Sequence, residues 1–169
     1  MIMSEQELKL HVPKSARTSL KGAMLRGAVT RVRLRAQYFD TPERALVTAG
    51  ISLRLRQEGR TWVQTLKMAG SNPLSRLELN HRRPDATLDL SVYDDSPAKK
   101  PLAKAAKELS VCYETDIQRL YRRIRTPAGV VEVAFDTGQI KAGGLILPVC
   151  EVEFELVSGQ LQAVFLLGL

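Results

Sequence analysis

The sequence is poor in cysteine and in aromatic residues, and each shortage excludes a class of protein. Cys112 and Cys150 are the only cysteines and show no CxxC or Cys/His spacing. They are too few for the disulfide framework of a small secreted protein or for a structural zinc site. Aromatic residues make up 5% of the chain and are not interleaved with basic residues, which argues against a stacking platform for single-stranded nucleic acid. We therefore expect no nucleic-acid partner.

Long apolar runs and phosphate-binding glycine loops are missing as well. No apolar run reaches the roughly 20 residues that a membrane-spanning helix needs, and "SEQELKL" places acidic residues where a signal peptide would be basic and then apolar. We expect a cytoplasmic protein without a membrane partner. Neither GxxxxGK[ST] nor GxGxxG occurs, so a phosphate ligand would be held by side chains.

Charge is what the chain has in excess. Its 25 Lys and Arg against 18 Asp and Glu give a net charge of +7 over 169 residues, which favours a polyanionic partner. A chain of this length fits one domain, residues 1–169, with a sizeable core.

Charged and apolar residues alternate along about eight segments, which predicts strands with two different faces. "SEQELKLHV" places Glu5, Glu7 and Lys9 on one face, and "VCEVEFELV" does the same with Glu151 and Glu153. Charged strand faces are ordinarily solvated. If the sheet closes into a barrel, however, these faces can line a polar cavity while helices cover the apolar outside.

Proline, glycine and capping residues predict three short helices between the strands. Thr41 is a plausible N-cap and Pro42 suits the first helical position, with Gly50 as the stop. The Ala- and Lys-rich stretch before the last strands predicts a helix that starts after Pro101. The helices are expected within residues 13–25, 41–50 and 97–111, and a hairpin turn at 58–60.

The spacing of these motifs resembles a known family. "EQELKL" resembles the ExExK motif of the CYTH superfamily, the triphosphate tunnel metalloenzymes, and the match extends through "YFDTPERALVTAGISLRLRQEG", "WVQTLK", "VEVAFDTGQI" and "EVEFEL". ExExK alone is a weak signal, but in register with these segments it is a strong one. The resemblance implies an α+β fold: an eight-stranded antiparallel closed β-barrel, the triphosphate tunnel, with short helices packed outside. Lys and Arg would hold a linear triphosphate there, and carboxylates would hold one or two divalent metals.

Carried over position by position, the resemblance implies a phosphate-binding set and a metal-binding set. The phosphate-binding residues would be Lys9, Arg54, Arg56, Lys67, Arg119 and, favoured over Arg122 by alternation, Arg123. The metal ligands would be Glu5, Glu7, Glu78, Asp136, Glu151 and Glu153, with Glu5, Glu7 and Lys9 forming the catalytic motif. Asn80 stands where relatives often carry another Glu. Hard cations such as Mg2+ or Mn2+ prefer such oxygen ligands.

Two residue assignments stay open. Lys9 could bind phosphate or restrain a neighbouring carboxylate. Arg31, Arg33 and Arg35 could lie at the tunnel rim or in solvent.

The implied activity is metal-dependent hydrolysis of inorganic triphosphate (tripolyphosphate) to pyrophosphate and phosphate. The pattern looks most like the bacterial branch in which this domain precedes a helical CHAD domain. Relatives use the same tunnel for class IV-type adenylate cyclisation or for thiamine triphosphate hydrolysis, and a non-catalytic polyphosphate- or nucleotide-binding module is an alternative from another class. The sequence stops at "VFLLGL", where an apolar helix is expected to begin, so a truncated longer protein is also open.

Overall fold

The computed structural model of the chain describes residues 3–69 and 75–168, and the side chains of residues 6–69 and 76–167. In these ranges eight strands form: β1 (Met3–His11), β2 (Thr30–Asp40), β3 (Ile51–Glu58), β4 (Thr61–Ala69), β5 (Ser75–Arg83), β6 (Ser110–Thr126), β7 (Gly129–Ala142) and β8 (Leu145–Gly159). The helices there are η1 (Lys14–Ala16), α1 (Arg17–Met24), α2 (Ala45–Thr48), η2 (Leu90–Tyr93), α3 (Lys99–Ala105) and α4 (Gln162–Gly168). None of these described helices is long and apolar enough to cross a membrane.

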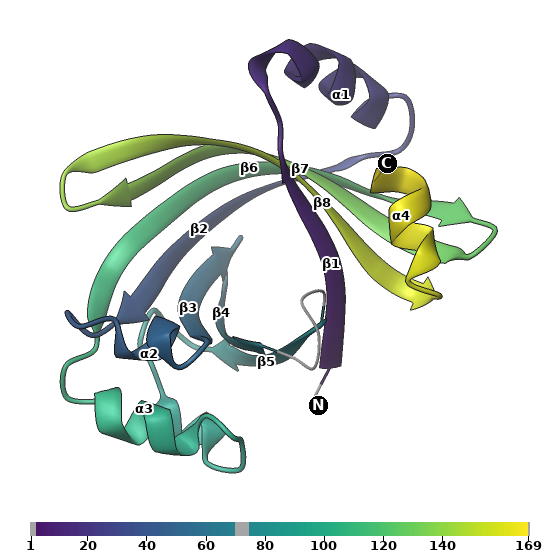
Figure 1. The fold of residues 1–169 in the computed structure, drawn as a ribbon. Helices are drawn as coiled ribbons and strands as arrows, with labels where there is room; N and C mark the ends of the chain where they lie inside the picture. Colours follow the sequence, from purple (N-terminus) through teal and green to yellow (C-terminus); the bar gives the residue numbers. More distant parts are fainter. Residues whose placement is uncertain (1–2, 70–74, 169) are drawn as a thin grey trace.

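The strands form one antiparallel, strongly curled sheet in the order β1-β5-β4-β3-β2-β6-β7-β8 (Figure 1). β1 joins the two ends of this order, pairing with β5 through residues 3–6 and with β8 through residues 7–11. Because β5 and β8 pair with different halves of β1, the barrel is staggered where it closes. The predicted eight-stranded antiparallel sheet is confirmed, and its closure depends on the two short pairings of β1.

Helices cover the apolar outer face of the sheet at two places, as the alternation predicted. On one side, α1 and α4 lie against β6, β7, β8 and β1 (Figure 1), where Phe135, Phe154 and Val164 belong to one buried cluster. On the other side, α2, η2 and α3 cover β3, β4 and β5, where Leu53 and Leu66 pack in a second buried cluster. Burial of these outer faces holds the curled sheet together, which leaves its inner face for polar residues.

The helix expected after Thr41 is shorter than predicted. α2 starts at Ala45, because Arg44 takes a left-handed conformation with φ 59°. The Thr41 hydroxyl does accept a hydrogen bond from the Ala45 N–H at 3.1 Å. Most of the capping comes from the buried Asp40 carboxylate, which accepts from the Leu46 N–H at 2.8 Å and from the next N–H in the chain at 3.1 Å. A carboxylate in this position satisfies N–H groups that have no intrahelical partner.

The third predicted helix begins earlier and ends earlier than expected. α3 starts at Lys99, so Pro101 lies inside its first turn rather than before it. Proline is tolerated there because the first N–H groups of a helix have no intrahelical acceptor. β6 already begins at Ser110, which is why the helix cannot continue to residue 111.

Tyr93 is expected to make the protein less stable at alkaline pH. Its side chain is 1% exposed in the cluster under η2 and α3, and this burial raises its pKa from 10.0 to about 12. The folded state therefore holds the phenol proton more tightly than the unfolded state. The resulting stability is fully present below pH 10 and is lost as pH rises through 12. Between pH 9 and 12 the wild type should lose about 2 kcal/mol more than Tyr93→Phe in urea unfolding; parallel losses in the two proteins would contradict this.

Candidate functional site

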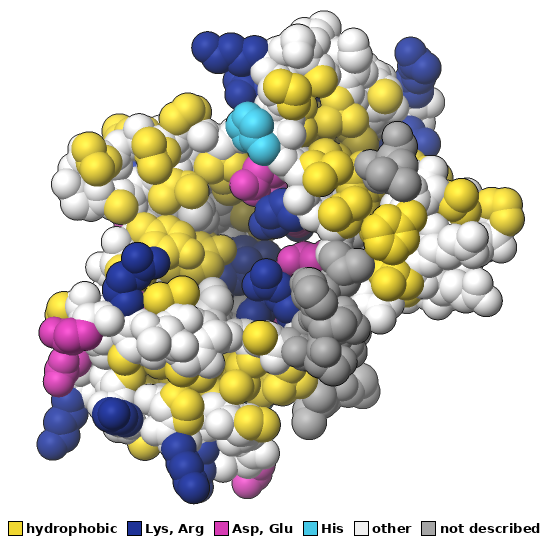
Figure 2. All heavy atoms as spheres, in the orientation of Figure 1, with side chains coloured by type: hydrophobic (Ala, Val, Ile, Leu, Met, Phe, Trp, Pro, Cys, Tyr) yellow, Lys and Arg dark blue, Asp and Glu magenta, His cyan; other side chains and the backbone are white. Residues whose placement is uncertain are grey.

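Seven of the predicted site residues line one cavity on the inner face of the sheet. Its volume is about 220 Å³. Figure 2 shows basic and acidic side chains together in the hollow in the middle of one face of the molecule. The seven are Lys9, Arg54, Arg56, Arg119, Asp136, Glu151 and Glu153, which come from β1, β3, β6, β7 and β8. We call this space the charged cavity.

Strand register explains why residues so far apart in sequence meet there. Arg119 lies opposite Asp136, and Asp136 lies opposite Glu151. Lys9 lies opposite Glu153. Directly opposed residues point to the same face of a sheet, so β6, β7, β8 and β1 bring their charges to one place.

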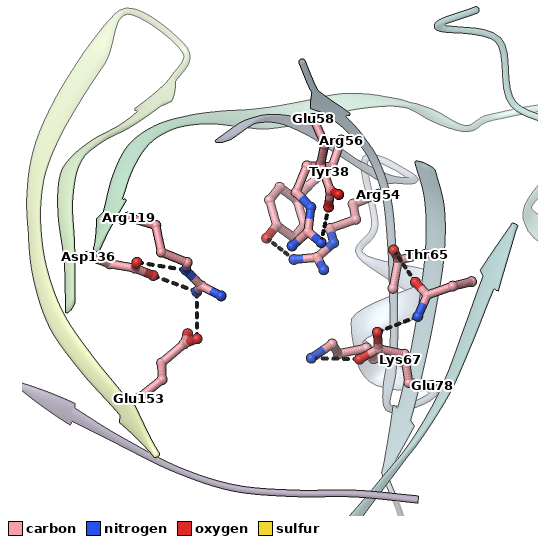
Figure 3. A network of polar contacts seen from close by, with 11 residues as sticks. Tyr38, Arg54, Arg56, Glu58, Thr65, Lys67, Glu78, Arg119, Asp136 and Glu153 are labelled. Atoms are coloured by element: carbon pink, nitrogen blue, oxygen red, sulfur yellow. Dashed lines mark hydrogen bonds and ion pairs between the residues drawn. The ribbon is translucent and has the colours of Figure 1, made fainter. Parts of the chain in front are cut away.

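Arg119 and Lys9 hold the carboxylates of this region, and Figure 3 shows the contacts that Arg119 makes. Arg119 donates to both oxygens of Asp136, at 2.8 and 2.6 Å, and to Glu153 at 2.5 Å. The Lys9 ammonium lies 2.6 Å from the other Glu153 oxygen and 3.7 Å from Glu151. Burial alone would raise the pKa of Glu153, but Arg119 and Lys9 together hold that pKa below its usual range. Glu153 is thus an ionised carboxylate shared by two cations.

Arg54 and Arg56 of β3 face this acidic group across the hollow (Figure 3). Arg54 donates one hydrogen bond from Nη1 to the Tyr38 hydroxyl at 3.4 Å, and Arg56 pairs with Glu58. The Nε atoms of both arginines are buried without a hydrogen-bond partner in the described part of the chain. Burial, followed by repulsion from Arg54, lowers the pKa of Arg56. A buried donor without an acceptor is unfavourable, and a bound anion would supply the missing acceptors.

A third group of charges comes from β4 and β5. The Lys67 ammonium lies 2.9 Å from Glu78, and the two side chains point into the hollow (Figure 3). Asn80 donates to Glu78 at 2.6 Å and accepts from the Thr65 hydroxyl at 2.7 Å. The Asn80 amide therefore orients the Glu78 carboxylate.

Arg123 and Glu7 are not among the described residues that line the charged cavity. Arg123 shares the inner face with Arg119, as alternation predicted, but it pairs with Glu132 at 3.2 Å and its side chain is 66% exposed. Glu7 lies on β1 opposite Glu155. Glu5 belongs to β1, but its side chain lies outside the described residues.

The open question about the arginines of β2 has a clear answer. Leu34, Ala36 and Tyr38 line the charged cavity, so alternation places Arg31, Arg33 and Arg35 on the outer face. Arg33 there donates to the Asp116 carboxylate at 2.8 and 2.6 Å. The charged face of β2 is thus its solvent face.

The sequence patterns missed two residues of the site, Tyr38 and Glu58. Glu58 follows Arg54 and Arg56 in the same alternation, so strand periodicity contained its signal. Tyr38 contacts Arg54 because the two residues are partners across β2 and β3. No pattern within one strand encodes such a pairing.

The donor chemistry of the cavity fits a hard divalent cation. Asp136, Glu151 and Glu153 all line it and offer carboxylate oxygens, which Mg2+ and Mn2+ prefer. In this arrangement, no three acidic, histidine or cysteine side chains of the described residues lie close enough together to hold one ion. Arg119 engages both Asp136 oxygens, whereas Glu151 is 35% exposed and its ion-pair partner among the described residues is Lys9, at 3.7 Å. Ligation by Glu153 would require it to turn away from Lys9 and Arg119.

Comparison with known proteins gives two curated relatives and several solved structures with the same fold. The inorganic triphosphatase of Haemophilus influenzae is 33% identical over 135 residues, which cover 76% of this chain and 37% of the relative. The chain thus spans little more than a third of the length of that protein.

Among solved structures, a putative adenylate cyclase from Bacillus halodurans is 20% identical with a TM-score of 0.64, over 96% of this chain and 84% of the other. A putative adenylyl cyclase from Hippeastrum is 16% identical with a TM-score of 0.59, over 99% and 85%. These structures share the curled sheet. Residues 3–167 match the CYTH domain, and the chain therefore belongs to the CYTH domain family.

Proposed function

We propose that this chain hydrolyses inorganic triphosphate to pyrophosphate and phosphate with Mg2+ or Mn2+ as cofactor. The observation that carries the proposal is the pair Arg54 and Arg56. Their Nε atoms are buried and lack acceptors in the described part, and the pair faces carboxylates across one cavity. Acidic side chains beside an anion are unfavourable unless a cation joins them, so the mixture favours a metal-bound polyphosphate over simple anion binding. The name of the Haemophilus influenzae relative, an inorganic triphosphatase, supports the same substrate.

The basic residues would bind and orient the phosphate chain. These residues come from three strands around the hollow, β3 (Arg54 and Arg56), β4 (Lys67) and β6 (Arg119), and would contact phosphate oxygens from several sides. Phosphoryl transfer depends mostly on positioning and on neutralising charge, and preorganised donors supply both.

The carboxylates would hold the cation and orient the attacking water. Glu151 and Glu153, which line the charged cavity, are the proposed ligands, and Glu7, two residues before Lys9 and on the same face of β1, would join them. A bound divalent cation would neutralise the phosphate oxygens and lower the pKa of water. Asp136 fixes Arg119 through two hydrogen bonds. Lys9, at 2.6 Å from Glu153, restrains that carboxylate, which favours the second of its two predicted roles.

Phosphate release tests this proposal directly. Tripolyphosphate, ATP and thiamine triphosphate are incubated with the protein in Mg2+, Mn2+ or EDTA. We expect tripolyphosphate to be turned over with metal and at least about 100-fold more slowly in EDTA. Cyclic AMP formed from ATP would instead support a cyclase. Tight binding of tripolyphosphate without any turnover would support a binding module.

A further inference from the structure

A second cavity of about 710 Å³ adjoins the charged cavity. It lies where β2 and β7 end and where β3 and β6 begin, and its lining includes Phe39, Val47, Ile51 and Leu53. We call it the apolar cavity. Among the described residues, Tyr38, Tyr113 and Ile140 line both cavities, so these three side chains stand between them.

Tyr38 and Tyr113 form a stacked pair at this boundary. They are direct partners across β2 and β6, and their rings stack with centroids 4.4 Å apart and planes 12° apart. The Tyr38 hydroxyl accepts from Arg54 at 3.4 Å, so the pair also contacts the proposed phosphate-binding group. Burial raises the pKa of Tyr113, which keeps its phenol neutral beside an anionic ligand.

A strand irregularity fixes the position of the pair. Pairing of β2 with β6 shifts between Tyr38, which lies opposite Tyr113, and Phe39, which lies opposite Val111. Cys112 is the extra residue, and its Sγ donates to the Tyr38 carbonyl at 3.2 Å. Such bulges redirect side chains and are common beside functional sites.

The two cavities suit different parts of a substrate. The charged cavity, at about 220 Å³, is smaller than the roughly 300–1,000 Å³ typical of sites for organic ligands, whereas the apolar cavity falls within that range. A triphosphate ester whose phosphates lie beside Arg54 needs room for its organic group, and the apolar cavity, which shares Tyr38 and Tyr113 with the charged cavity, is large enough to offer it. Free tripolyphosphate has no such group.

We propose that the stacked Tyr38–Tyr113 pair separates the charged cavity from the apolar cavity and thereby favours binding of free tripolyphosphate over triphosphate esters. We call this pair the specificity wall. The inference rests on the proposed function, because it assumes that the phosphates lie beside Arg54. The tyrosines exclude the ester through the volume of their rings and take no part in the chemistry.

Calorimetric binding of tripolyphosphate and of ATP to the wild type and to Tyr113→Ala tests the wall. Both titrations are run in EDTA, so that neither ligand is turned over. The wild type should bind tripolyphosphate more tightly than ATP. Tyr113→Ala should narrow this preference by about tenfold or more, because the ester group gains access to the apolar cavity. Tyr113→Leu, which fills more of the space, serves as a second variant if circular dichroism shows that the alanine variant does not fold.

Two matched controls separate the wall from general effects. Tyr113→Phe keeps the ring and should keep the wild-type preference. Val47→Ala enlarges the apolar cavity at a residue that does not line the charged cavity, and it should also leave the preference unchanged. An unchanged preference in the folded alanine or leucine variant, or equal binding of both ligands by the wild type, would overturn the inference. Absence of tripolyphosphate turnover with metal would overturn the proposed function alone, since the binding ratio is measured without turnover.

Discussion

Replacing Arg54 by methionine is expected to lower kcat/KM for tripolyphosphate hydrolysis by about 100-fold or more. The Arg54 Nε is buried without an acceptor among the described residues, and the hydrogen bond from Arg54 Nη1 to the Tyr38 hydroxyl is a long one at 3.4 Å. A guanidinium in that state is free to donate to phosphate oxygens, and methionine keeps much of its volume but none of its donors. Phosphate release gives kcat and KM, and calorimetry in EDTA gives the loss in tripolyphosphate affinity.

Arg33→Met is the matched control for this substitution. Arg33 lies on the outer face of β2 and pairs with Asp116, so its loss removes the same charge from the chain without touching the cavity. Its activity should stay within about twofold of the wild type, as expected for an exposed ion pair. An equal decrease of kcat/KM in Arg54→Met and Arg33→Met would mean that the net charge of the chain governs activity, and not the place of Arg54 in the cavity.

Alternation predicted the strands well but could not say which face of each strand lies inside. On β1, β3 and β8 the charged face lines or borders the cavity, as expected. On β2 this arrangement is reversed, because its charged face, with Arg31, Arg33 and Arg35, points outward. Leu34 and Tyr38 of the opposite face line the cavity. The helices cover β3–β5 and the β6–β8 and β1 side, so the outer face of β2 meets solvent and can carry charge. A period of two identifies two faces, but their surroundings depend on packing against distant segments.

The candidate site was predictable where its residues belong to one motif and less so where they meet across strands. Arg54, Arg56 and Glu153 follow from local spacing together with the family resemblance. The Tyr38–Arg54 contact, the Asn80–Glu78 hydrogen bond and the bulge at Cys112 depend on register between strands, which local periodicity does not encode. These cross-strand contacts decide how each charged group is held before substrate binds.

Glu153→Gln is expected to separate binding from turnover. In the wild type, the Glu153 carboxylate lies 2.6 Å from the Lys9 ammonium and 2.5 Å from the Arg119 guanidinium. It therefore competes with phosphate for both cations. Without metal, the neutral amide should bind tripolyphosphate about tenfold more tightly. With metal, kcat should fall by about 100-fold or more, because one proposed ligand has lost its charge. Calorimetry in EDTA and phosphate release in Mg2+ measure the two effects on the same preparation.

The pKa of Glu153 sets the pH range over which wild type and Glu153→Gln differ in tripolyphosphate binding. Because the pKa of Glu153 lies below its ordinary value of 4.5, the carboxylate is charged throughout the neutral range, and the binding difference between wild type and variant should be constant there. The tripolyphosphate affinities of the two proteins should converge only as pH falls below 4.5.

Glu132→Gln is the matched control. Glu132 pairs with the exposed Arg123, so its amide variant should change binding and kcat by less than about threefold. Weaker binding of tripolyphosphate to Glu153→Gln in EDTA would show that Glu153 positions Lys9 and Arg119 for the substrate rather than competing with it.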